Sequence, residues 1–381
     1  MKLFFKKISI YLLKYLLLFL SFLTIVFYYF TNTYVGNIHL SSILSNYLSK
    51  KSQNIVDVYY LNFDYYPKIE AKMRLNKRIN LTVKGHINRD SFLDNESTFE
   101  GRADIDTNGS AIGKIDFFNG VYNRNREALF CEYNLSIYDL SYFKKELRGE
   151  YSGEVRAKGR LSYRDMLKID GDTDKFGGNL HFYYDKNDVE LKLENISFIN
   201  LLKAYNYPIF LTAKVFGKIE YNQANKAISF DTKFRETKFF RTEITDKLLE
   251  KAEINLLNGL YDKSSFKGIY QHSILSALLK VVNRHEHIYL KNIIINYDTY
   301  RIHSKFDIDM QGKEIFGDIS GTVDNPKVSV DVSRILMHKM GKGFGGFFFW
   351  FFNSLFTFFP LFNPSFYLVS LFFLIFKKIV V

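Results

Sequence analysis

The sequence has very little cysteine and proline, and each shortage removes a class of structure. Cys131 is the only cysteine in 381 residues, so no disulfide can form within the chain. The cysteine count does not indicate the cellular compartment, because proteins of every compartment can lack disulfides. Only 5 residues are proline, whereas 47% are hydrophobic and 18% aromatic, which argues against a disordered protein. Aromatic and β-branched residues favour strands, so we expect a folded, strand-rich chain.

The sequence also lacks an internal linker and a recognisable catalytic motif. No Pro/Gly/Ser-rich stretch divides residues 55–332, which predicts one continuous β-rich body. Serine, histidine and acidic residues are scattered without a nucleophile elbow or a zincin motif. We therefore expect a protein that is not an enzyme and that uses no cofactor.

Several short segments resemble ligand sites, and each has a simpler interpretation. His285 and His287 could share a strand face and bind a metal, but no third ligand accompanies them. A polar strand start or helix end is the favoured interpretation. The run 104–109 begins like a calcium loop, but Ile115 stands where the bidentate glutamate belongs, which favours a hairpin turn. Cys131 lies beside an aromatic residue and is interpreted as a packing residue.

Two more segments are interpreted as irregular structure. Asp170, Asp172 and Asp174 repeat the start of a calcium loop, but Lys175 stands where a glycine belongs, so a turn is favoured. The glycine-rich run 341–346 does not lead from a strand into a helix, as a phosphate-binding loop would. It is interpreted as a flexible joint.

Positive charge exceeds negative charge. The chain has 52 Lys and Arg against 40 Asp and Glu, which gives a net charge of +12 at pH 7. A basic surface favours anionic lipid headgroups or nucleic acid. Both signs alternate along the predicted strands, which argues against a surface for nucleic acid. The expected partners are membrane lipids, with envelope proteins as a further class and no nucleic acid.

The first thirty residues predict a membrane anchor. An apolar run extends from Ile8 through Leu18 to Phe30, and Lys14 is its only charged residue. A span needs about 20 apolar residues. Lysines precede the run, so the positive-inside rule places the N-terminus in the cytoplasm and the rest of the chain across the membrane. A cleaved signal peptide is the alternative, but the run is long for one and no A-x-A-like site follows it.

Two stretches alternate between apolar and polar residues, as half-buried strands do. Residues 150–163 follow a helix-capable segment at 135–147. Residues 209–222 follow a predicted helix at 198–205, which Pro208 ends. Both stretches contain a Gly-base-aliphatic-polar-aromatic pattern that also occurs near residue 113, so we interpret them as copies of a degenerate repeat.

The apolar residues of these two strands form one predicted face, which we call the groove face. Its members are Tyr151, Val155, Leu161, Ile209, Leu211, Val215 and Ile219. Lys158, Lys214 and Lys218 are expected on the opposite face, in water. Periodicity alone does not decide whether the groove face is covered by the protein itself or offered to a ligand.

Further helices are predicted at 39–51, 245–257 and 273–283, the last from an apolar stripe at helical spacing. Turn signals separate the predicted strands. They are Asp94-Asn95, Asn108-Gly109, Asp170-Gly171, Asp185 to Asp188 and Gln311-Gly312.

The C-terminus is apolar and rich in phenylalanine. Pro360 and Pro364 split residues 344–376, and two lysines follow. Three alternatives remain open: a segment that crosses the membrane back to the cytoplasm, a segment embedded without spanning, and a frameshifted or read-through end. The predicted domains are an anchor at 1–30, a β-rich body at 31–340 and a membrane-associated tail at 341–381.

The body resembles the AsmA-like family. In residues 316–331 a glycine-bounded strand leads to an Asn-Pro-Lys turn and a last strand, and a short helix is expected at 333–340. The helix and glycine-ended strand at 198–221 are similar to the same family's C-terminal region. The phenylalanine-rich tail departs from the polar or amphipathic tail expected there, which puts the C-terminus in doubt.

This resemblance implies a fold and a location. The expected fold is mainly β, with an N-terminal transmembrane helix, a few short helices and an elongated, curled, antiparallel-rich sheet that forms a groove. The resemblance also implies an inner-membrane protein of a double-membrane bacterium, with its bulk in the periplasm. Its groove would bind lipid acyl chains and serve phospholipid transport and outer-membrane biogenesis.

Two other functions compete with lipid transfer. A non-catalytic assembly or scaffold protein would bind other envelope proteins through an edge strand or through the predicted helix at 273–283. An enzyme such as a hydrolase is the third alternative, and the missing catalytic constellation argues against it.

Overall fold

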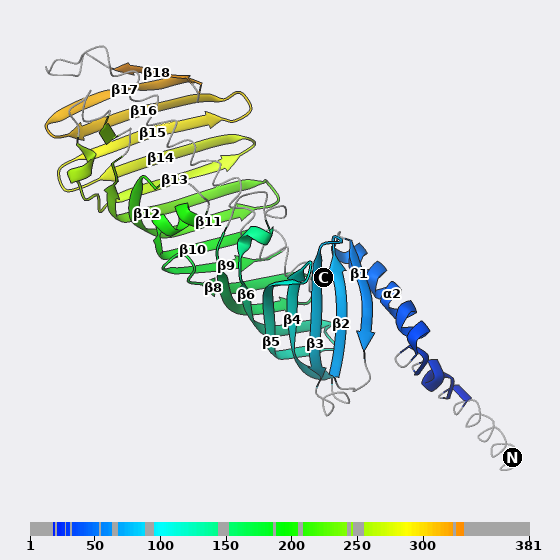
Figure 1. Cartoon of the computed structure of the whole chain (residues 1–381). Coiled ribbons are helices and arrows are strands. Elements are labelled where there is room, and N and C mark those ends of the chain that lie inside the picture. Colours follow the sequence, from blue (N-terminus) through cyan, green and yellow to red (C-terminus); the bar gives the residue numbers. More distant parts are fainter. Residues whose placement is uncertain are drawn as a thin grey trace, which may run out of the picture. The chain divides into compact units, whose positions relative to one another are not determined.

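The computed structural model describes most of the chain up to Val330. The described residues are 18–19, 21–26, 28–30, 33–52, 55–62, 68–87, 95–143, 152–185, 188–204, 209–241, 245–246, 255–322 and 325–330. They divide into two compact units, one that ends at Leu135 and one that begins at Ser136. The boundary lies inside a strand, where the composition gives no signal of it. Figure 1 shows the elements in chain order.

The first unit is a helix followed by an antiparallel meander. Its elements are α2 (Tyr34–Ser52), β1 (Val56–Asn62), β2 (Lys68–Leu75), β3 (Ile79–Ile87), β4 (Glu96–Thr107), β5 (Ser110–Asn123) and most of β6 (Ala128–Ile137). From β1 to β5, each strand pairs with the next.

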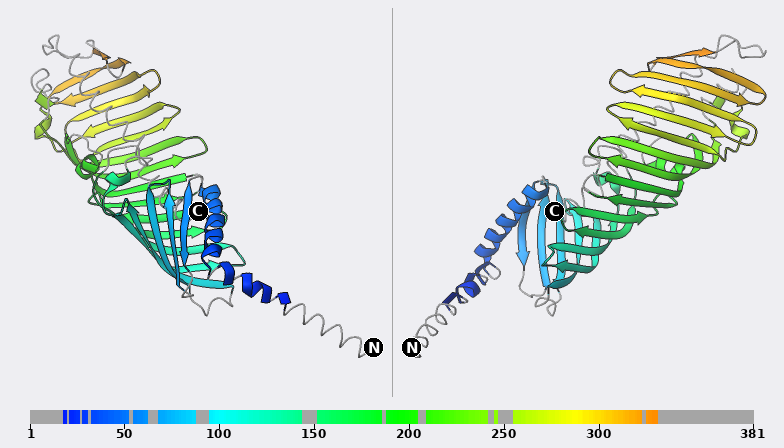
Figure 2. Two further views of the ribbon diagram at one scale, coloured as in Figure 1. Left: turned by 45° about the vertical axis from the view of Figure 1, so that its right-hand side comes forward. Right: turned by 180° about the vertical axis from the view of Figure 1, so that it is seen from behind.

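The second unit continues the same pattern. After a short 3₁₀ helix, η2 (Leu140–Phe143), come β7 (Val155–Tyr163), β8 (Leu167–Thr173), β9 (Asn179–Tyr184), β10 (Asp188–Ser197), α4 (Phe198–Ala204), β11 (Leu211–Asn222) and β12 (Ala227–Phe239). Then come η3 (Leu256–Asn258), β13 (Ser264–Gln271), β14 (Ile274–Val282), β15 (His287–Asn296), β16 (Arg301–Met310), β17 (Lys313–Thr322) and β18 (Asn325–Val330). Figure 2 shows β11 to β18 as successive arrows of a single twisted layer.

The expectation of a mainly β, antiparallel chain with few helices is confirmed. Every described pairing is antiparallel and joins strands that follow one another along the chain. Among the described pairings, the first strand of each unit does not pair with the last, so the sheet is open. The predicted order of a helix at 198–205 followed by a strand is confirmed by α4 and β11.

Bulges keep the apolar residues of long strands on one face. Leu193 and Ile196 in β10 are three positions apart, which would place them on opposite faces of a regular strand. Both are nevertheless buried, because β10 carries an extra residue there and Asn195 adopts a φ of 58°. Leu290 and Ile293 in β15 are likewise both buried, on either side of a bulge in that strand. Such a bulge shifts the alternation by one position.

Glycines allow neighbouring strands to approach closely. A Cβ atom on Gly159 would lie 1.9 Å from the carbonyl oxygen of Asp170 on the next strand. A Cβ atom on Gly217 would lie 2.1 Å from the carbonyl oxygen of Asp231, also on the next strand. These two glycines belong to the predicted repeat, and they meet the same local requirement in β7 and β11.

Helix α2 covers the open edge of β1. The Ser49 hydroxyl accepts a hydrogen bond from the Val56 N–H (2.9 Å) and donates one to the Val56 carbonyl (3.0 Å). The Ser45 hydroxyl accepts from the Val58 N–H at 2.8 Å. An uncovered edge strand offers such groups to other chains. The serines of α2 satisfy them within the unit, in a helix predicted from residue 39 and found to begin at Tyr34.

Some local predictions were wrong. The apolar stripe at 273–283 forms strand β14 instead of a helix, and both of its neighbours, β13 and β15, pair with it. Periodicity alone does not distinguish a short apolar strand from a helix, and here the backbone is paired on both edges, with Leu275, Ala277 and Val281 buried on one face. Asp170 and Asp172 lie inside β8 and not in a turn, whereas Asp174 follows that strand. Most of the predicted helix at 245–257 lies outside the described residues.

The predicted anchor and tail fall largely outside the described residues. Helical residues occur within 18–30, but residues 1–17, Ile8 among them, and 341–381 are not described. In the part of the chain that is described, no helix has the length and hydropathy that crossing a membrane requires. The division into anchor, body and tail stays a prediction.

We expect Gly159→Ala to destabilise the second unit by about 1–3 kcal/mol, because the added methyl group must push β7 away from β8. Gly85→Ala is the matched control, since a Cβ atom there lies 3.5 Å from its nearest neighbour, an ordinary contact. Urea unfolding followed by circular dichroism measures both. Equal urea midpoints for Gly159→Ala and Gly85→Ala would contradict the close approach of β7 and β8 at Gly159.

We expect Ser49→Ala to loosen the edge of β1. The substitution leaves the Val56 N–H and carbonyl without their described partner, at a cost of about 1–3 kcal/mol. Amide hydrogen exchange over residues 55–62 should therefore become faster. Ser42→Ala, on the exposed side of the same helix, should leave the exchange unchanged.

Candidate functional site

The sheet has a charged face and an apolar face. On the charged face, cross-strand ion pairs join neighbouring strands. Arg160 Nη2 lies 3.0 Å from Asp170 Oδ2, and Lys267 Nζ lies 2.6 Å from Asp231 Oδ2. Cross-strand pairs of opposite charge stabilise a sheet by about 0.2–1 kcal/mol each. This face therefore neutralises much of its own charge.

The structure places the members of the groove face in two groups. Val155 and Leu161 lie in β7 with exposures of 2% and 0%, while Lys158 is exposed. The predicted alternation of this strand is confirmed. Tyr151 lies outside the described residues.

The second group belongs to β11 and the residues before it. Val215 is 3% exposed, whereas Leu211 and Ile219 are half-buried. Ile209 precedes β11 and is 40% exposed, so it does not share the burial of the others. Ile219 lies opposite Phe230 of β12 and packs against a large apolar cluster. Strands β8 to β10 separate this group from the first.

The large apolar cluster lies on β12 to β17. Its buried members are Ile228, Phe230, Leu256, Tyr261, Phe266, Leu275, Ala277, Val281, Ile288, Leu290, Ile293, Ile295, Ile302, Phe306, Ile308, Met310, Ile315 and Ile319. Two of them, Leu256 and Tyr261, come from the segment between β12 and β13, and the others come from the strands. Within the described residues, no second sheet packs on this face.

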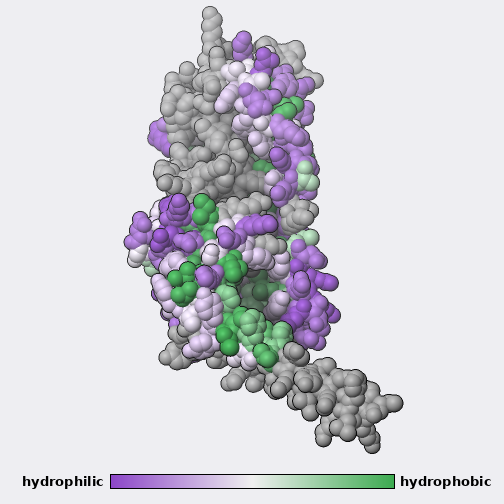
Figure 3. Space-filling model, turned by 90° about the vertical axis from the view of Figure 1, so that its right-hand side faces the viewer, coloured by the Kyte–Doolittle hydropathy of each residue, from purple (hydrophilic) through white to green (hydrophobic). Residues whose placement is uncertain are grey.

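Apolar side chains are also exposed on α2. Tyr34 is 82% exposed, and Ile43 and Tyr47 are each 57% exposed. Figure 3, which looks onto the side that carries α2, shows hydrophobic side chains gathered beside a hollow on the lower part of that face. Hydrophilic side chains line the right-hand edge of the same view.

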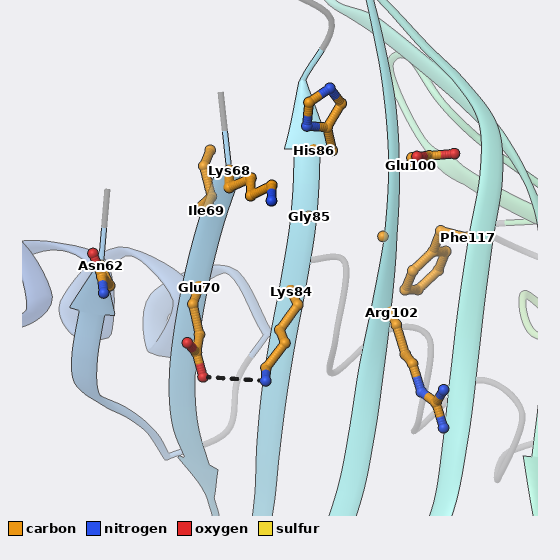
Figure 4. Close-up of a pocket in the computed structure, with 11 residues that line it drawn as sticks. Asn62, Lys68, Ile69, Glu70, Lys84, Gly85, His86, Glu100, Arg102 and Phe117 are labelled. Carbon is orange, nitrogen blue, oxygen red and sulfur yellow. Dashed lines mark ion pairs between the residues drawn. The ribbon is translucent and has the colours of Figure 1, made fainter. Parts of the chain in front are cut away.

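The first unit contains a cavity of about 510 Å³ that we call the glycine notch. It is lined by Asn62, Lys68, Ile69, Glu70, Lys84, Gly85, His86, Glu100, Gly101, Arg102 and Phe117. Ile69 pairs with Gly85, Gly85 with Gly101, and Gly101 with Phe117, so these four form a row across β2 to β5. Figure 4 shows Gly85 between Ile69 and Phe117.

The glycines create the notch. Residues directly opposite in a sheet share a face, and the next row along the strands is Ala71, Val83, Ala103 and Ile115. The row is therefore part of the apolar face. Two adjacent positions in it have no side chain, which leaves a gap flanked by an isoleucine and a phenylalanine.

The charged residues that line the glycine notch alternate with the row along the strands, so their side chains lie on the opposite face of the sheet. Glu70 lies 3.8 Å from Lys84, and Arg102 lies 2.8 Å from Asp104. Lys68 is exposed and lies opposite His86. No carboxylate among the described residues lies within ion-pair distance of Lys68.

A second cavity, of about 630 Å³, lies in the second unit and is polar. It is lined by Ser152, Glu154, Arg156, Asp174, Lys175, Asn200, Lys203 and Ala204. Lys175 Nζ donates to the carbonyls of Ser152 (3.1 Å) and Glu154 (2.8 Å). Burial lowers the pKa of Lys175, while Asp139 and Glu154 oppose this shift. The lysine thus holds the segment before β7, which is a structural role.

The histidine pair is part of a hairpin. The Asn283 side chain accepts hydrogen bonds from the N–H groups of His285 (2.8 Å) and Glu286 (2.7 Å), and β15 begins at His287. His287 Nε2 lies 3.1 Å from Asp307 Oδ1, and its ring stacks on Tyr289. The strand-start interpretation is confirmed. Among the described residues, no group of three or more His, Cys, Asp or Glu could hold a metal ion.

Two other interpretations are also confirmed. Asn108 and Gly109 join β4 to β5 with φ values of 50° and 81°, as a two-residue hairpin turn requires. Cys131 is 2% exposed, and burial raises the pKa of its thiol to about 12. A thiol in this state is a packing group and not a nucleophile.

The sequence reasoning missed the glycine notch. Its four row members, Ile69, Gly85, Gly101 and Phe117, each follow the previous one by 16 residues. In a meander of equal hairpins, such a spacing places residues side by side. The spacing and the glycine pair were therefore the signal that could have found it.

We expect Asp307→Asn to destabilise the protein at pH 7 but not at low pH. Burial raises the pKa of Asp307, but hydrogen bonds from Lys291 and His287 outweigh it and hold the pKa below its usual value. A carboxyl group whose pKa is lower in the folded than in the unfolded protein stabilises the folded state at pH values above its unfolded pKa, about 3.9. This stabilisation is lost as the pH falls through the folded pKa.

Urea unfolding at pH 7 and near pH 3 measures this difference. Asp309→Asn, two positions along the same strand, is the control, since Asp309 forms no ion pair among the described residues. The same loss of stability for Asp307→Asn at both pH values would rule out the electrostatic origin.

No protein-family model, curated protein or solved structure matches this chain. The likeness to the AsmA-like family therefore remains a resemblance carried by the residues quoted for it.

Proposed function

We propose that this chain is a non-catalytic, membrane-anchored envelope protein that binds lipid acyl chains on the apolar face of its sheet. In this proposal residues 1–30 anchor it in the inner membrane of a double-membrane bacterium, and its bulk lies in the periplasm. Its role is phospholipid transport for outer-membrane biogenesis. No cofactor takes part.

One observation carries the proposal: a single antiparallel layer keeps one face apolar over many consecutive strands. A soluble protein normally covers such a face with a second layer of structure. Within the described residues, only short elements such as η3 accompany this layer. The centre of this face is buried, as Leu290 and Ile293 are, whereas Ile219 and Tyr221 beside it are only partly buried. An acyl chain that covered the partly buried residues would gain about 0.8 kcal/mol for each buried methylene.

A scaffold protein is the second candidate. The observation in its favour is that α2 exposes apolar residues, among them Ile43 and Tyr47, which are four positions apart on one side of the helix. Exposed apolar patches commonly mark sites of protein or membrane contact. The segment 273–283 does not serve this candidate as a contact helix, because it is a central strand.

The test uses the full-length chain in its own membrane. The photoreactive residue benzoylphenylalanine replaces Ile219 on the apolar face or, as the matched control, Lys218 on the charged face of the same strand. After irradiation, mass spectrometry identifies what is attached. We expect phospholipid adducts at position 219 and few at position 218.

Two results would contradict the proposal. Equal lipid adducts at both positions would mean that the apolar face is no special site. Adducts at position 219 only with peptides of another protein would favour the scaffold instead.

A further inference from the structure

We infer that the chain's own C-terminal segment, residues 344–376, covers the apolar face of β12 to β17. The segment lies on the buried centre of this face, whereas the lipid of the proposed function lies on its partly buried margin. Three features support this assignment: burial without a described cover, the position of β18, and the composition of the segment.

A row of apolar residues at one end of these strands is buried. Strand pairing places its members directly opposite one another across β12 to β16, so they share a face. The members of this row, which we call the far row, are Ile228, Tyr270, Leu275, Ile295 and Ile302. Tyr270 is partly buried, and the other four are 0–4% exposed.

The described segment that covers this face lies at the other end of the strands. Leu256 and Tyr261 are the buried members of the large apolar cluster that come from outside the strands. The Gln311 side chain donates a hydrogen bond to the Asn255 carbonyl at 3.0 Å. The Tyr261 N–H donates to the Thr237 carbonyl, also at 3.0 Å. The segment 255–261 is therefore fixed to the sheet at both of its ends.

This segment does not reach the far row. Thr237 is nine residues from Ile228 along the chain, and Gln311 is nine residues from Ile302. Nine residues of strand extend about 30 Å at about 3.3 Å each, which is far beyond the length of a side chain. The far row is nevertheless buried within a single chain, so its cover belongs to the same chain, outside the described ranges.

Two stretches outside the described residues are both long and rich in apolar residues, 1–17 and 331–381. The first contains four lysines and precedes α2 in the first unit. The second follows directly from β18, which belongs to the same sheet as the far row. The shorter stretch 247–254, beside η3, has four charged residues among its eight, which is unsuitable for an apolar face.

The C-terminal segment is long enough to reach the far row. Five strand steps separate β18 from β13, which is about 24 Å at about 4.8 Å per step. Fourteen residues lead from Val330 to Phe344 and extend up to about 46 Å at about 3.3 Å each. With the helix that the sequence predicts at 333–340, the reach is still about 32 Å.

The composition of the C-terminal segment matches the face. Phenylalanine makes up 14 of its 33 residues, and none of the 33 is charged. Apolar side chains that pack on an apolar face leave water on both sides of the contact. Tyr270 and Tyr297 already pair edge to face, with ring centroids 5.7 Å apart, and offer further aromatic surface. Burial raises the pKa of Tyr297, which is consistent with a covered face.

Photocrosslinking of the full-length chain in its membrane tests the contact. Benzoylphenylalanine replaces Tyr270 on the apolar face or, as the matched control, Ile269, which is 51% exposed in the same strand. After irradiation and digestion with chymotrypsin, mass spectrometry identifies the attached fragments. We expect fragments of residues 344–376 at position 270, in a product that migrates as a monomer. Their yield should be about tenfold above that at position 269, because neighbouring residues of a strand point to opposite faces.

Resistance to trypsin shows that each variant has folded. Tyr297 is the second probe position if the variant at position 270 does not fold.

Trp350 gives a second measurement that needs no substitution, because it is the only tryptophan and lies in the C-terminal segment. The full-length chain is placed in phosphatidylcholine vesicles with or without bromine on the acyl chains. Bromine quenches tryptophan fluorescence on contact. We expect nearly equal emission in the two kinds of vesicle, since Trp350 lies against the protein and not against lipid.

Several results would overturn the inference. Loss of most of the Trp350 emission in brominated vesicles would place the segment in the membrane. No adduct at position 270, or adducts there only with a second copy or another protein, would also overturn it. Phospholipid adducts at position 270 without fragments of 344–376 would overturn the inference and leave the proposed function intact. Fragments of 344–376 at position 270 with no phospholipid at position 219 would support the inference and overturn the proposed function.

Discussion

The alternation of side chains along an extended strand is the constraint from which the other features follow. In a single β layer, every strand sends its odd and even residues to opposite faces. Apolar residues at every second position therefore produce a wholly apolar face, and the residues between them produce a charged one. In β7 this separates the buried Val155 and Leu161 from the exposed Lys158. Such an apolar face is stable only when it is kept from water, and its central residues are buried in this structure.

Long strands keep their apolar residues on one face only with the help of β-bulges. The strands twist, and a regular pattern cannot follow a bending sheet over ten or more residues. Bulges at Asn195 in β10 and Asn292 in β15 insert one residue and return the following apolar side chain to the buried face. Asparagine tolerates the left-handed conformation that these positions require. Glycines such as Gly159 serve the same sheet by letting adjacent backbones approach.

Glycines also shape the candidate site. Where a glycine stands opposite another glycine, as Gly85 does opposite Gly101, the side-chain layer has a gap. The apolar face of the first unit therefore lacks side chains at two adjacent positions of this row. On the reverse face, ion pairs such as Lys84 with Glu70 link neighbouring strands. Site and scaffold thus depend on the same strand registers.

The sequence by itself determined the class of fold, the faces of β7 and β11, the helix before β11 and the hairpin at Asn108-Gly109, because each depends on neighbours a few residues apart. Only the tertiary structure decided that residues 274–282 form a strand, that bulges place Leu290 and Ile293 on one face, and that serines of α2 cover β1. It alone assembled Ile69, Gly85, Gly101 and Phe117 into one row. The reason is physical: strand pairing joins residues that are distant in the chain, and register, not local propensity, determines which of them meet.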